Sequence, residues 1–345
     1  MSVPSLHRVF IQGFRAIQQP LELDLRSPRG EPSEMTIIAG TNGSGKTTVL
    51  EAILFGLGVE HLIIRDQAER EESILGQMPE GARVEVDVSL DGAPPVTWVR
   101  TAREHFSRGE HGQQTPDPAA PLYKGRVVEY FSSRRAPRLV GAVKPLMSGH
   151  PPGDAEANRL WKLKQRIIDQ RSRRAYAPPR FPWVESREEG WLRKLNEAWA
   201  RLHNDDGTSI DAEIVNPDAE DLYADLFIMK EGNRLCSIDE ASSGEIELLS
   251  LMGWMILNDF TSGLLLIDEP ELHLHPQWQA SILPAIRRLA PEAQIIVASH
   301  ADAPWEQAFS FQRYLLTTHF DPESFMQDEA RGVDSAKLAD ERGDT

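Results

Sequence analysis

The segment best suited to chemistry is the octapeptide Gly-Thr-Asn-Gly-Ser-Gly-Lys-Thr at residues 40–47, called here the phosphate loop. It fits the pattern G-x-x-x-x-G-K-[ST], in which glycines let backbone N–H groups turn toward phosphate oxygens. An apolar run at 35–39 precedes it and a helical stretch at 48–57 follows, as such a loop requires. Lys46 would contact the β- and γ-phosphates and Thr47 would coordinate Mg²⁺, so the sequence predicts a nucleoside triphosphate site.

Two carboxylates, Asp268 and Glu269, end the continuous apolar run at 264–267. Such a run is typical of a strand buried on both faces. Alone, the pattern also fits a strand that ends in surface acids. A phosphate loop needs a carboxylate partner, however, so we expect Asp268 to hold Mg²⁺ and Glu269 to orient or deprotonate the attacking water.

A third polar strand end follows the apolar run at 295–298, where Ser299 and His300 stand. An imidazole can donate to the γ-phosphate, although a lone histidine is as often structural. Because His300 is the third polar strand end in this order, a functional role is favoured over a structural one. We therefore predict that Lys46, Glu269 and His300 are the catalytic residues.

Small hydroxyl residues and a glycine precede the apolar helix expected at 246–257. They are Ser242, Ser243, Gly244 and Glu245, called here the serine corner (residues 242–245). A helix N-terminus of this composition can bind an anion, and an ordinary N-cap is the alternative.

Secondary-structure patterns predict a mainly parallel α/β core whose nucleotide lies at the carboxyl ends of the strands. Strict alternation at 83–90 predicts a strand, Asp91-Gly92 a turn, and 96–100 a strand that pairs back as a hairpin. Residues 104–121 contain almost nothing apolar and are expected to form a loop. Further elements are expected as strands at 225–229, 234–238, 264–267 and 294–298, and helices from Ser243 and over 276–289.

A short helical lobe is expected between residues 154 and 203, where two apolar stripes flank a proline-rich segment at 177–182. Basic residues concentrate in and near this lobe, and they fit either a DNA-binding strip or a solvated helix face. DNA contact would use 134–138 and 162–180, with the side chains of Arg134, Arg135, Arg138, Lys162, Lys164, Arg166, Arg171, Arg173, Arg174 and Arg180.

Composition narrows the class of protein. The 345 residues carry a formal net charge of −16, which argues against coating nucleic acid through the overall field. The single cysteine, Cys236, excludes an intramolecular disulfide, suits a reducing cytoplasm, and is expected to be a buried thiol. No apolar run reaches the length of a membrane span and no signal segment is evident, so we expect a soluble cytoplasmic protein.

As a set, these motifs resemble the SMC/RecF/OLD branch of the ABC-type ATPases. The segment 269–276, Glu-Pro-Glu-Leu-His-Leu-His-Pro, is especially similar to that of OLD-like and PtuA-like ATPases. The resemblance covers roughly 1–60 and 225–305. It rests on Phe14-Arg15, the phosphate loop, the serine corner, Leu266 to Pro270 and Ser299-His300.

The resemblance implies an α/β P-loop ATPase head with an antiparallel β subdomain and a short helical lobe insertion. Residues 1–150 and 211–320 would form the head, the second part with signature, Walker B and H-loop motifs. Residues 151–210 would form the lobe and 321–345 an acidic, flexible tail.

The resemblance also implies that heads form a homodimer or higher homo-oligomer, each ATP lying between one head's phosphate loop and the other head's serine corner. Glu271 and His273 are then candidates for the dimer interface. His273 and His275 more readily pack or cap than bind metal. The nucleotide-binding set is Arg15, Gly40, Thr41, Asn42, Gly43, Ser44, Gly45, Lys46, Thr47, Thr48, Ser242, Ser243, Gly244 and Glu245, and Thr47 with Asp268 would hold Mg²⁺.

Several features depart from the family pattern. Ala241 replaces the usual leucine, and Tyr130 to Arg135 stand where a Q-loop glutamine is expected, so that Arg134 or Arg135 is a candidate sensor. The long coiled coil of repair proteins and a nuclease domain are not expected.

Three functions therefore stay open. The first is an ATPase of a bacterial anti-phage defence system that controls a separate nuclease or toxin. The second is a RecF-like repair factor that binds DNA. The third, the ATPase of a membrane transporter, is disfavoured because the full signature and Q-loop are missing.

Overall fold

A computed structural model describes residues 2–63, 81–108, 114–116, 122, 127–133, 141–143, 159–176, 182–216 and 223–316. At its centre lies a five-stranded parallel sheet in the order β14-β3-β13-β12-β8. Its strands are β3 (Met35–Gly40), β8 (Val128–Phe131), β12 (Ser262–Asp268), β13 (Glu292–Ser299) and β14 (Arg313–Leu316). The predicted parallel core is confirmed, with strands from both halves of the chain side by side.

A six-stranded sheet with antiparallel pairing forms the β subdomain, in the order β2-β1-β4-β5-β6-β7. Its strands are β1 (Pro4–Gln12), β2 (Leu21–Asp24), β4 (Arg83–Leu90), β5 (Val96–Thr101), β6 (His105–Arg108) and β7 (Gln114–Pro116). The predicted hairpin is confirmed, and its Asp91-Gly92 turn has positive φ at both residues. The loop expected at 104–121 is partly wrong, because β6 and β7 pair at the edge of this sheet.

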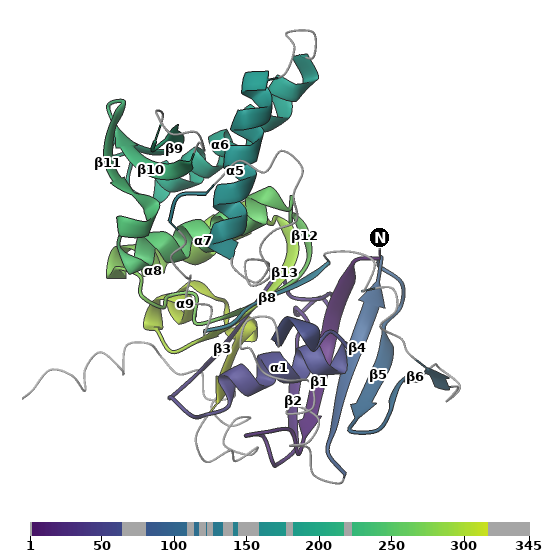
Figure 1. The fold of residues 1–345 in the computed structure, drawn as a ribbon. Coiled ribbons are helices and arrows are strands. Elements are labelled where there is room, and N and C mark those ends of the chain that lie inside the picture. Colours follow the sequence, from purple (N-terminus) through teal and green to yellow (C-terminus); the bar gives the residue numbers. More distant parts are fainter. Residues whose placement is uncertain are drawn as a thin grey trace, which may run out of the picture.

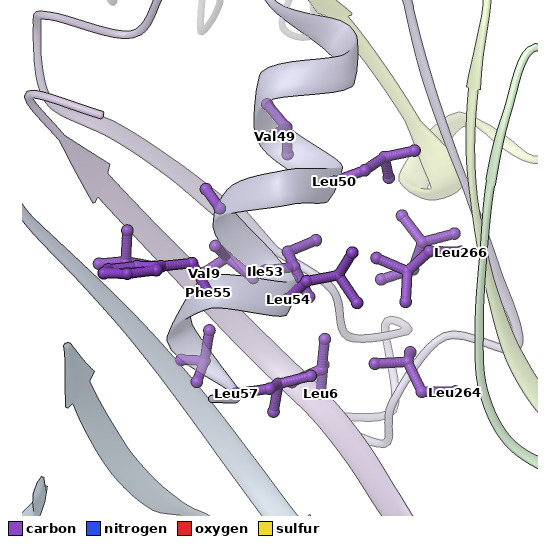
Figure 2. Close-up of a cluster of buried hydrophobic side chains, with 14 of the residues drawn as sticks. Leu6, Val9, Val49, Leu50, Ile53, Leu54, Phe55, Leu57, Leu264 and Leu266 are labelled. Carbon is purple, nitrogen blue, oxygen red and sulfur yellow. The ribbon is translucent and has the colours of Figure 1, made fainter. Parts of the chain in front are cut away.

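The two faces of the parallel sheet are covered by different layers. Leu264 and Leu266 of β12 belong to the core that contains α1 (Lys46–Gly56) and the β subdomain. Figure 2 shows these leucines on one side of α1 with Leu50 and Leu54, Val9 of β1 beside Phe55 on the helix's other side, and Leu6 of β1 next to Leu57 at the helix's end. The helix that follows the phosphate loop is therefore buried between the two sheets, which explains why it is apolar nearly all round.

The opposite face of the sheet packs against α7 (Ser243–Leu257) and α8 (Pro276–Leu289). Leu265 and Ile267 of β12 point into this second core, as expected when successive residues of a strand face opposite ways. The shorter helices α9 (Asp302–Gln307), η2 (Ile238–Glu240) and η3 (Ser310–Gln312) complete this half. The predicted helices from Ser243 and over 276–289 are confirmed.

The lobe consists of α5 (Arg159–Tyr176), α6 (Pro182–Leu202) and a three-stranded antiparallel sheet in the order β11-β10-β9 (Figure 1). Strands β10 (Ala224–Lys230) and β11 (Asn233–Ser237) were expected, whereas β9 (Thr208–Ile214) was not. A third core joins these elements to Ile246, Leu249 and Ile256 on α7. Helix α7 is thus shared between the lobe and the parallel sheet.

The expected fold class, an ATPase-head α/β fold with an antiparallel β subdomain, is confirmed. Within the described part of the chain, no helix is long and apolar enough to cross a membrane. Cys236 is partly exposed rather than buried, because it lies on β11 at the edge of the small sheet.

Candidate functional site

The carboxyl ends of three neighbouring strands bring the predicted catalytic residues to one edge of the parallel sheet. In the strand register, Asp268 pairs with Ala298 and Ser299 pairs with Ala39. The phosphate loop, Glu269 and His300 each follow directly after these positions. Parallel strands connected in this way place their polar ends at a shared edge, where α/β proteins bind ligands.

The phosphate loop begins with a glycine that nothing larger can replace. Gly40 has φ of +153°, and a Cβ there would lie 2.4 Å from the backbone oxygen of Leu316 and 2.5 Å from Ser44 Oγ. The loop ends at Gly45, the N-cap of α1, which has no side chain to cap the first-turn N–H groups. Those N–H groups can therefore be satisfied by a phosphate.

Lys46 is buried and its ammonium group lies within the loop. Its Nζ donates to the carbonyl oxygens of Gly40 at 2.8 Å and Thr41 at 3.0 Å. Ser44 Oγ is buried and, among the described residues, has no hydrogen-bond partner. A bound phosphate would supply the acceptors that this ammonium and hydroxyl need, so the residues fit a nucleotide.

Residues 221 positions apart in the sequence form the candidate magnesium site. Thr47 Oγ1, on α1, donates to Asp268 Oδ2, at the tip of β12, across 2.8 Å. Asp268 is fully buried. Hydroxyl and carboxylate oxygens are the donors that Mg²⁺ prefers, so this pair fits the ion.

Glu269 leaves β12 with a left-handed backbone, φ +49°, which is uncommon for a residue with a side chain. Its N–H donates to the Ala298 oxygen at 2.8 Å, which fixes the turn against β13. The His300 Nδ1 lies 3.4 Å from Glu269 Oε1. The structure therefore brings the predicted base and the predicted γ-phosphate donor together.

Glu271 does not fit its predicted place at a dimer interface. Its side chain is buried, and Oε1 accepts from Ser299 Oγ at 2.6 Å, His300 N at 3.1 Å and Ala301 N at 3.3 Å. The His300 Nδ1 is 3.5 Å from the same oxygen. Glu271 is committed to its own head, where it fixes the backbone around His300. Sequence reasoning missed this, because the partners lie 28–30 positions away.

The other histidines of segment 269–276 have separate roles. His273 is exposed, with φ +63°, and remains a candidate for contact with a second head. His275 is the N-cap of α8, where Nδ1 accepts from Gln277 N at 3.4 Å, as expected for a capping residue. The described residues contain no group of three or more His, Cys, Asp or Glu side chains placed to bind a metal.

The serine corner is a capping box at the start of α7. Ser242 Oγ accepts from Glu245 N at 3.3 Å, and the Ser242 N–H donates to Glu245 Oε2 at 2.8 Å. Gly244 lies so close to segment 269–276 that a Cβ would be 2.8 Å from the His273 oxygen. Ser242 and Ser243 are exposed. The corner is therefore an N-cap that also leaves two hydroxyl residues accessible to a ligand.

Arg15 lies beside the phosphate loop rather than in it. Its guanidinium pairs with the buried Glu51 of α1, and its backbone has φ +48°. Ile17, two residues later, packs against Gly45. Thr48 is buried, whereas Thr41, Asn42 and Gly43 are exposed at the open side of the loop.

The segment that stands in place of a Q-loop follows β8, which pairs with β12 through Phe131 and Ile267. Ser132 is fully buried at the carboxyl end of this strand. The candidate sensors Arg134 and Arg135, together with Arg138, lie outside the described residues.

The predicted basic strip needs one correction. Lys164 is fully buried and paired with two aspartates, so it cannot contact DNA. Lys162 and Arg166 are exposed, and Arg166 lies over the ring of Trp191. The side chains of Arg171, Arg173, Arg174 and Arg180 lie outside the described part of the structure.

Two family models match this chain. One, described as "AAA domain, putative AbiEii toxin, Type IV TA system", matches residues 154–303, and another, described as "AAA domain", matches residues 8–112. The first match contains the serine corner, Asp268, Glu269 and His300, and the second contains the phosphate loop. Both halves of the candidate site therefore fall in sequence typical of AAA ATPases.

Curated relatives include Septu proteins and retron ATPases. The chain is 21% identical to the Septu protein PtuA of Bacillus mycoides (strain KBAB4) over 306 residues, 86% of this chain and 38% of that protein. It is 33% identical over 90 residues to the Retron Vc95 probable ATPase of Vibrio cholerae serotype O1 biovar El Tor, 23% of this chain and 17% of that protein. The chain thus spans less than two-fifths of the length of these relatives.

Solved structures share the fold. An Smc head bound to the C-winged helix domain of ScpA matches with a TM-score of 0.52 at 17% identity, covering 88% of this chain and 92% of that one. The Smc head of Pyrococcus furiosus with an extended coiled coil, bound to the C-terminal domain of ScpA, matches with a TM-score of 0.54 at 15% identity, covering 95% and 100%. The chain therefore has the fold of an Smc head and resembles, in its motifs and its relatives, the SMC/RecF/OLD-like AAA ATPases of defence systems.

Proposed function

We propose that this chain is an ATP-binding and ATP-hydrolysing head that dimerises around ATP and regulates a separate effector in a bacterial anti-phage defence complex. The observation that carries the proposal is the meeting of Lys46, the Thr47–Asp268 pair, Glu269 and His300 at one sheet edge. These groups supply phosphate binding, metal binding, a base and a proton donor.

The proposed reaction is transfer of the γ-phosphoryl group to water. Lys46 and the first-turn N–H groups of α1 hold the phosphates, while Thr47 and Asp268 would hold a Mg²⁺ ion, which would supply positive charge to the phosphate oxygens. Glu269 accepts a proton from the attacking water as the bond to the β-phosphate oxygen breaks. His300, held between Glu269 and Glu271, donates to a γ-phosphate oxygen.

Dimerisation around ATP is supported by the placement of the two anion-binding helix starts. Helix α1 packs on one face of the parallel sheet and α7 on the opposite face. The exposed Ser242 and Ser243 at the start of α7 would therefore serve the nucleotide of a second head. The exposed His273 would lie at the same interface.

The division of the chain supports a single head with an inserted lobe. Strands β3 and β8 come from residues 1–150 and β12, β13 and β14 from 211–320, and they form one sheet. Residues 151–210 supply α5, α6 and the beginning of β9.

Control of a separate nuclease or toxin is proposed from the relatives named for Septu and retron systems. A RecF-like role remains the competing proposal, and the exposed Lys162 and Arg166 are the described residues that would favour it.

Three variants test the ATPase. Lys46→Ala should abolish ATP binding in calorimetry. Glu269→Gln should bind ATP but hydrolyse it about 10²–10⁴-fold more slowly, the scale of a lost general base. Ser243→Arg should bind ATP as a monomer yet form no ATP-dependent dimer in light scattering. Rapid turnover by Glu269→Gln would contradict the base assignment, and normal dimers of Ser243→Arg would contradict the shared site.

The biological role is tested by purifying tagged Glu269→Gln from its native host with ATP, beside Lys46→Ala as the matched control. A small nuclease or toxin recovered at fixed ratio supports the defence complex. Recombination proteins or DNA alone would support the repair role instead.

A further inference from the structure

We propose that Lys164 is a positioning residue, which ties lobe helix α5 to the serine corner so that movement of the lobe changes the corner's half of the ATP site. This inference rests on the proposed sharing of ATP between two heads. It concerns a residue outside the nucleotide-binding set, on an element that the sequence associated with DNA.

The Lys164 ammonium is completely buried, and one of its partners, Asp239, lies in the segment just before the corner. Nζ lies 2.6 Å from Asp225 Oδ1 and 2.8 Å from Asp239 Oδ2, and it donates to the Gly141 oxygen at 3.2 Å. A buried charge is tolerated only when it is paired and hydrogen-bonded. The position of α5 and the positions of these carboxylates are therefore strongly coupled.

The two aspartates hold the start and the middle of the turn that leads into the corner. Asp239 lies within η2, three residues before Ser242, and its Oδ2 also accepts from Gly141 N at 2.6 Å. Asp225 Oδ2 accepts from Ser237 Oγ at 2.8 Å, and Ser237 is the N-cap of η2. One ammonium from the lobe thus fixes both the start and the middle of this turn.

A second lobe contact fixes the corner from its other side. His203, just after α6, stacks on Trp199 with ring centroids 3.8 Å apart and lies 4.8 Å from the Trp278 ring of α8. Its Nε2 is 3.6 Å from Oε1 of Glu245, the residue whose other carboxylate oxygen caps Ser242. Both lobe helices therefore reach the corner, one ahead of it and one behind it.

This arrangement gives a partner on the lobe a route to ATP turnover. Displacement of α5 would carry Asp239 and the η2 turn with it and shift Ser242 and Ser243. The phosphate loop of the same head would be unaffected, because α1 is packed in a different core. A substitution of Lys164 should then slow hydrolysis of the ATP that is held by the phosphate loop of the opposite head.

The test uses Lys164→Met and the milder Asp239→Ala, which leaves Lys164 paired with Asp225. Each should bind ATP like the unaltered chain but hydrolyse it about 100-fold more slowly, the scale of a displaced catalytic group. Arg8→Met is the matched control. It removes a cation paired with Glu22, Glu85 and Asp87 in the β subdomain and should leave hydrolysis unchanged.

Mixing variants separates positioning from loss of fold. Lys46→Ala lacks phosphate binding but keeps its corner, so an equal mixture with Lys164→Met or Asp239→Ala should regain hydrolysis at one of its two composite sites. A mixture of Lys46→Ala with Ser243→Arg should do the same by the proposed shared site. If only the Ser243→Arg mixture regains activity, the positioning role is wrong. If no mixture does, the shared site is wrong and the inference fails with it.

Discussion

The phosphate loop and the serine corner are both helix N-termini suited to anions, yet they are held in place by different means. The loop is fixed by its neighbours in sequence. Lys46 Nζ contacts the carbonyls of Gly40 and Thr41, and α1 begins at the residue after Gly45. Among its long-range contacts, those with Asp268 and Leu316 come from strands of the same sheet, and Ile17 packs against Gly45.

The serine corner depends on parts of the chain that are remote in sequence. Lys164 fixes the turn ahead of it, His203 approaches Glu245, and the His273 oxygen packs against Gly244. One half of the site is therefore held mainly within the parallel sheet, whereas the other is held by contacts with the lobe and with segment 269–276.

The largest expected effect is on ATP affinity, and it should distinguish Gly40 of the phosphate loop from Gly244 of the serine corner. Gly40→Ala forces a Cβ against the Leu316 oxygen at a positive φ, and a strained backbone costs about 1–3 kcal/mol, so ATP should bind roughly 10–100-fold more weakly. Gly244→Ala places its Cβ 2.8 Å from the His273 oxygen and should spare ATP binding by the monomer while impairing the ATP-dependent dimer. Calorimetry and light scattering measure the two quantities. If both variants lost the same amount of monomer affinity for ATP, the phosphate loop and the serine corner would not differ in the way described above.

Removing the buried carboxylate behind His300 should have the next largest effect. Glu271→Ala leaves Ser299 Oγ and the His300 N–H without their acceptor, and it leaves the Ala301 N–H with Ser299 Oγ alone. Hydrogen bonds to a charged group contribute about 1.5–3 kcal/mol, so kcat should fall about 10–100-fold while the dissociation constant of ATP is unchanged.

Glu271→Gln is the matched control, because it keeps a carbonyl oxygen at the same position and should retain more activity than the alanine variant. Equal turnover by both variants would show that the carboxylate does not fix His300.

A smaller effect is expected at the lobe's second contact. His203→Phe keeps an aromatic ring beside Trp199 and Trp278 but removes the contact with Glu245 and the contact of Nδ1 with the Trp199 oxygen. The free energy of unfolding should change by less than about 1.5 kcal/mol, because the aromatic ring is kept and a volume-conserving substitution costs little. The affinity of the ATP-dependent dimer should fall, as measured by analytical ultracentrifugation, while Arg193→Ala, on an exposed face of α6, should leave it unchanged.

The smallest expected effect is on the alkylation rate of Cys236, which reports on the Glu245 carboxylate of the serine corner. Burial raises the pKa of the Cys236 thiol, and the nearby Glu245 and Glu240 carboxylates raise it further. The reactive thiolate should therefore form only above the pH range of an ordinary thiol, so iodoacetamide should react slowly at neutral pH and faster as pH rises. Glu245→Gln should lower the pKa and accelerate alkylation at a given pH. An unchanged rate would show that the corner's carboxylate does not face β11.

Much of the phosphate-loop half of the site could be predicted, because the residue patterns that specify it lie in short segments of the sequence. Glycine spacing, the apolar runs that become β3, β12 and β13, and the polar residues that end them all lie in short segments. The parallel core follows, since such strands alternate with helices and are buried on both faces. The loop expected at 104–121 was partly wrong because short edge strands carry little apolar pattern.

The roles of Glu271 and Lys164 could not be predicted. Both are charged residues in stretches that also fit exposed surface, and charged side chains are rarely buried unless paired. Their partners lie tens of residues away, so the pairing exists only after folding.

The sequence by itself determined that this chain has a P-loop α/β core, a phosphate loop with its carboxylate and histidine strand ends, and a helical lobe. Backbone conformation and strand burial depend on residue type and on near neighbours, which is why these features can be deduced from the sequence. Only the tertiary structure decided that α1 and α7 occupy opposite faces of the sheet and that Glu271 serves its own head. It also decided that Lys164 connects the lobe to the segment before the serine corner, because a buried charge pairs with the opposite charges that folding brings close to it.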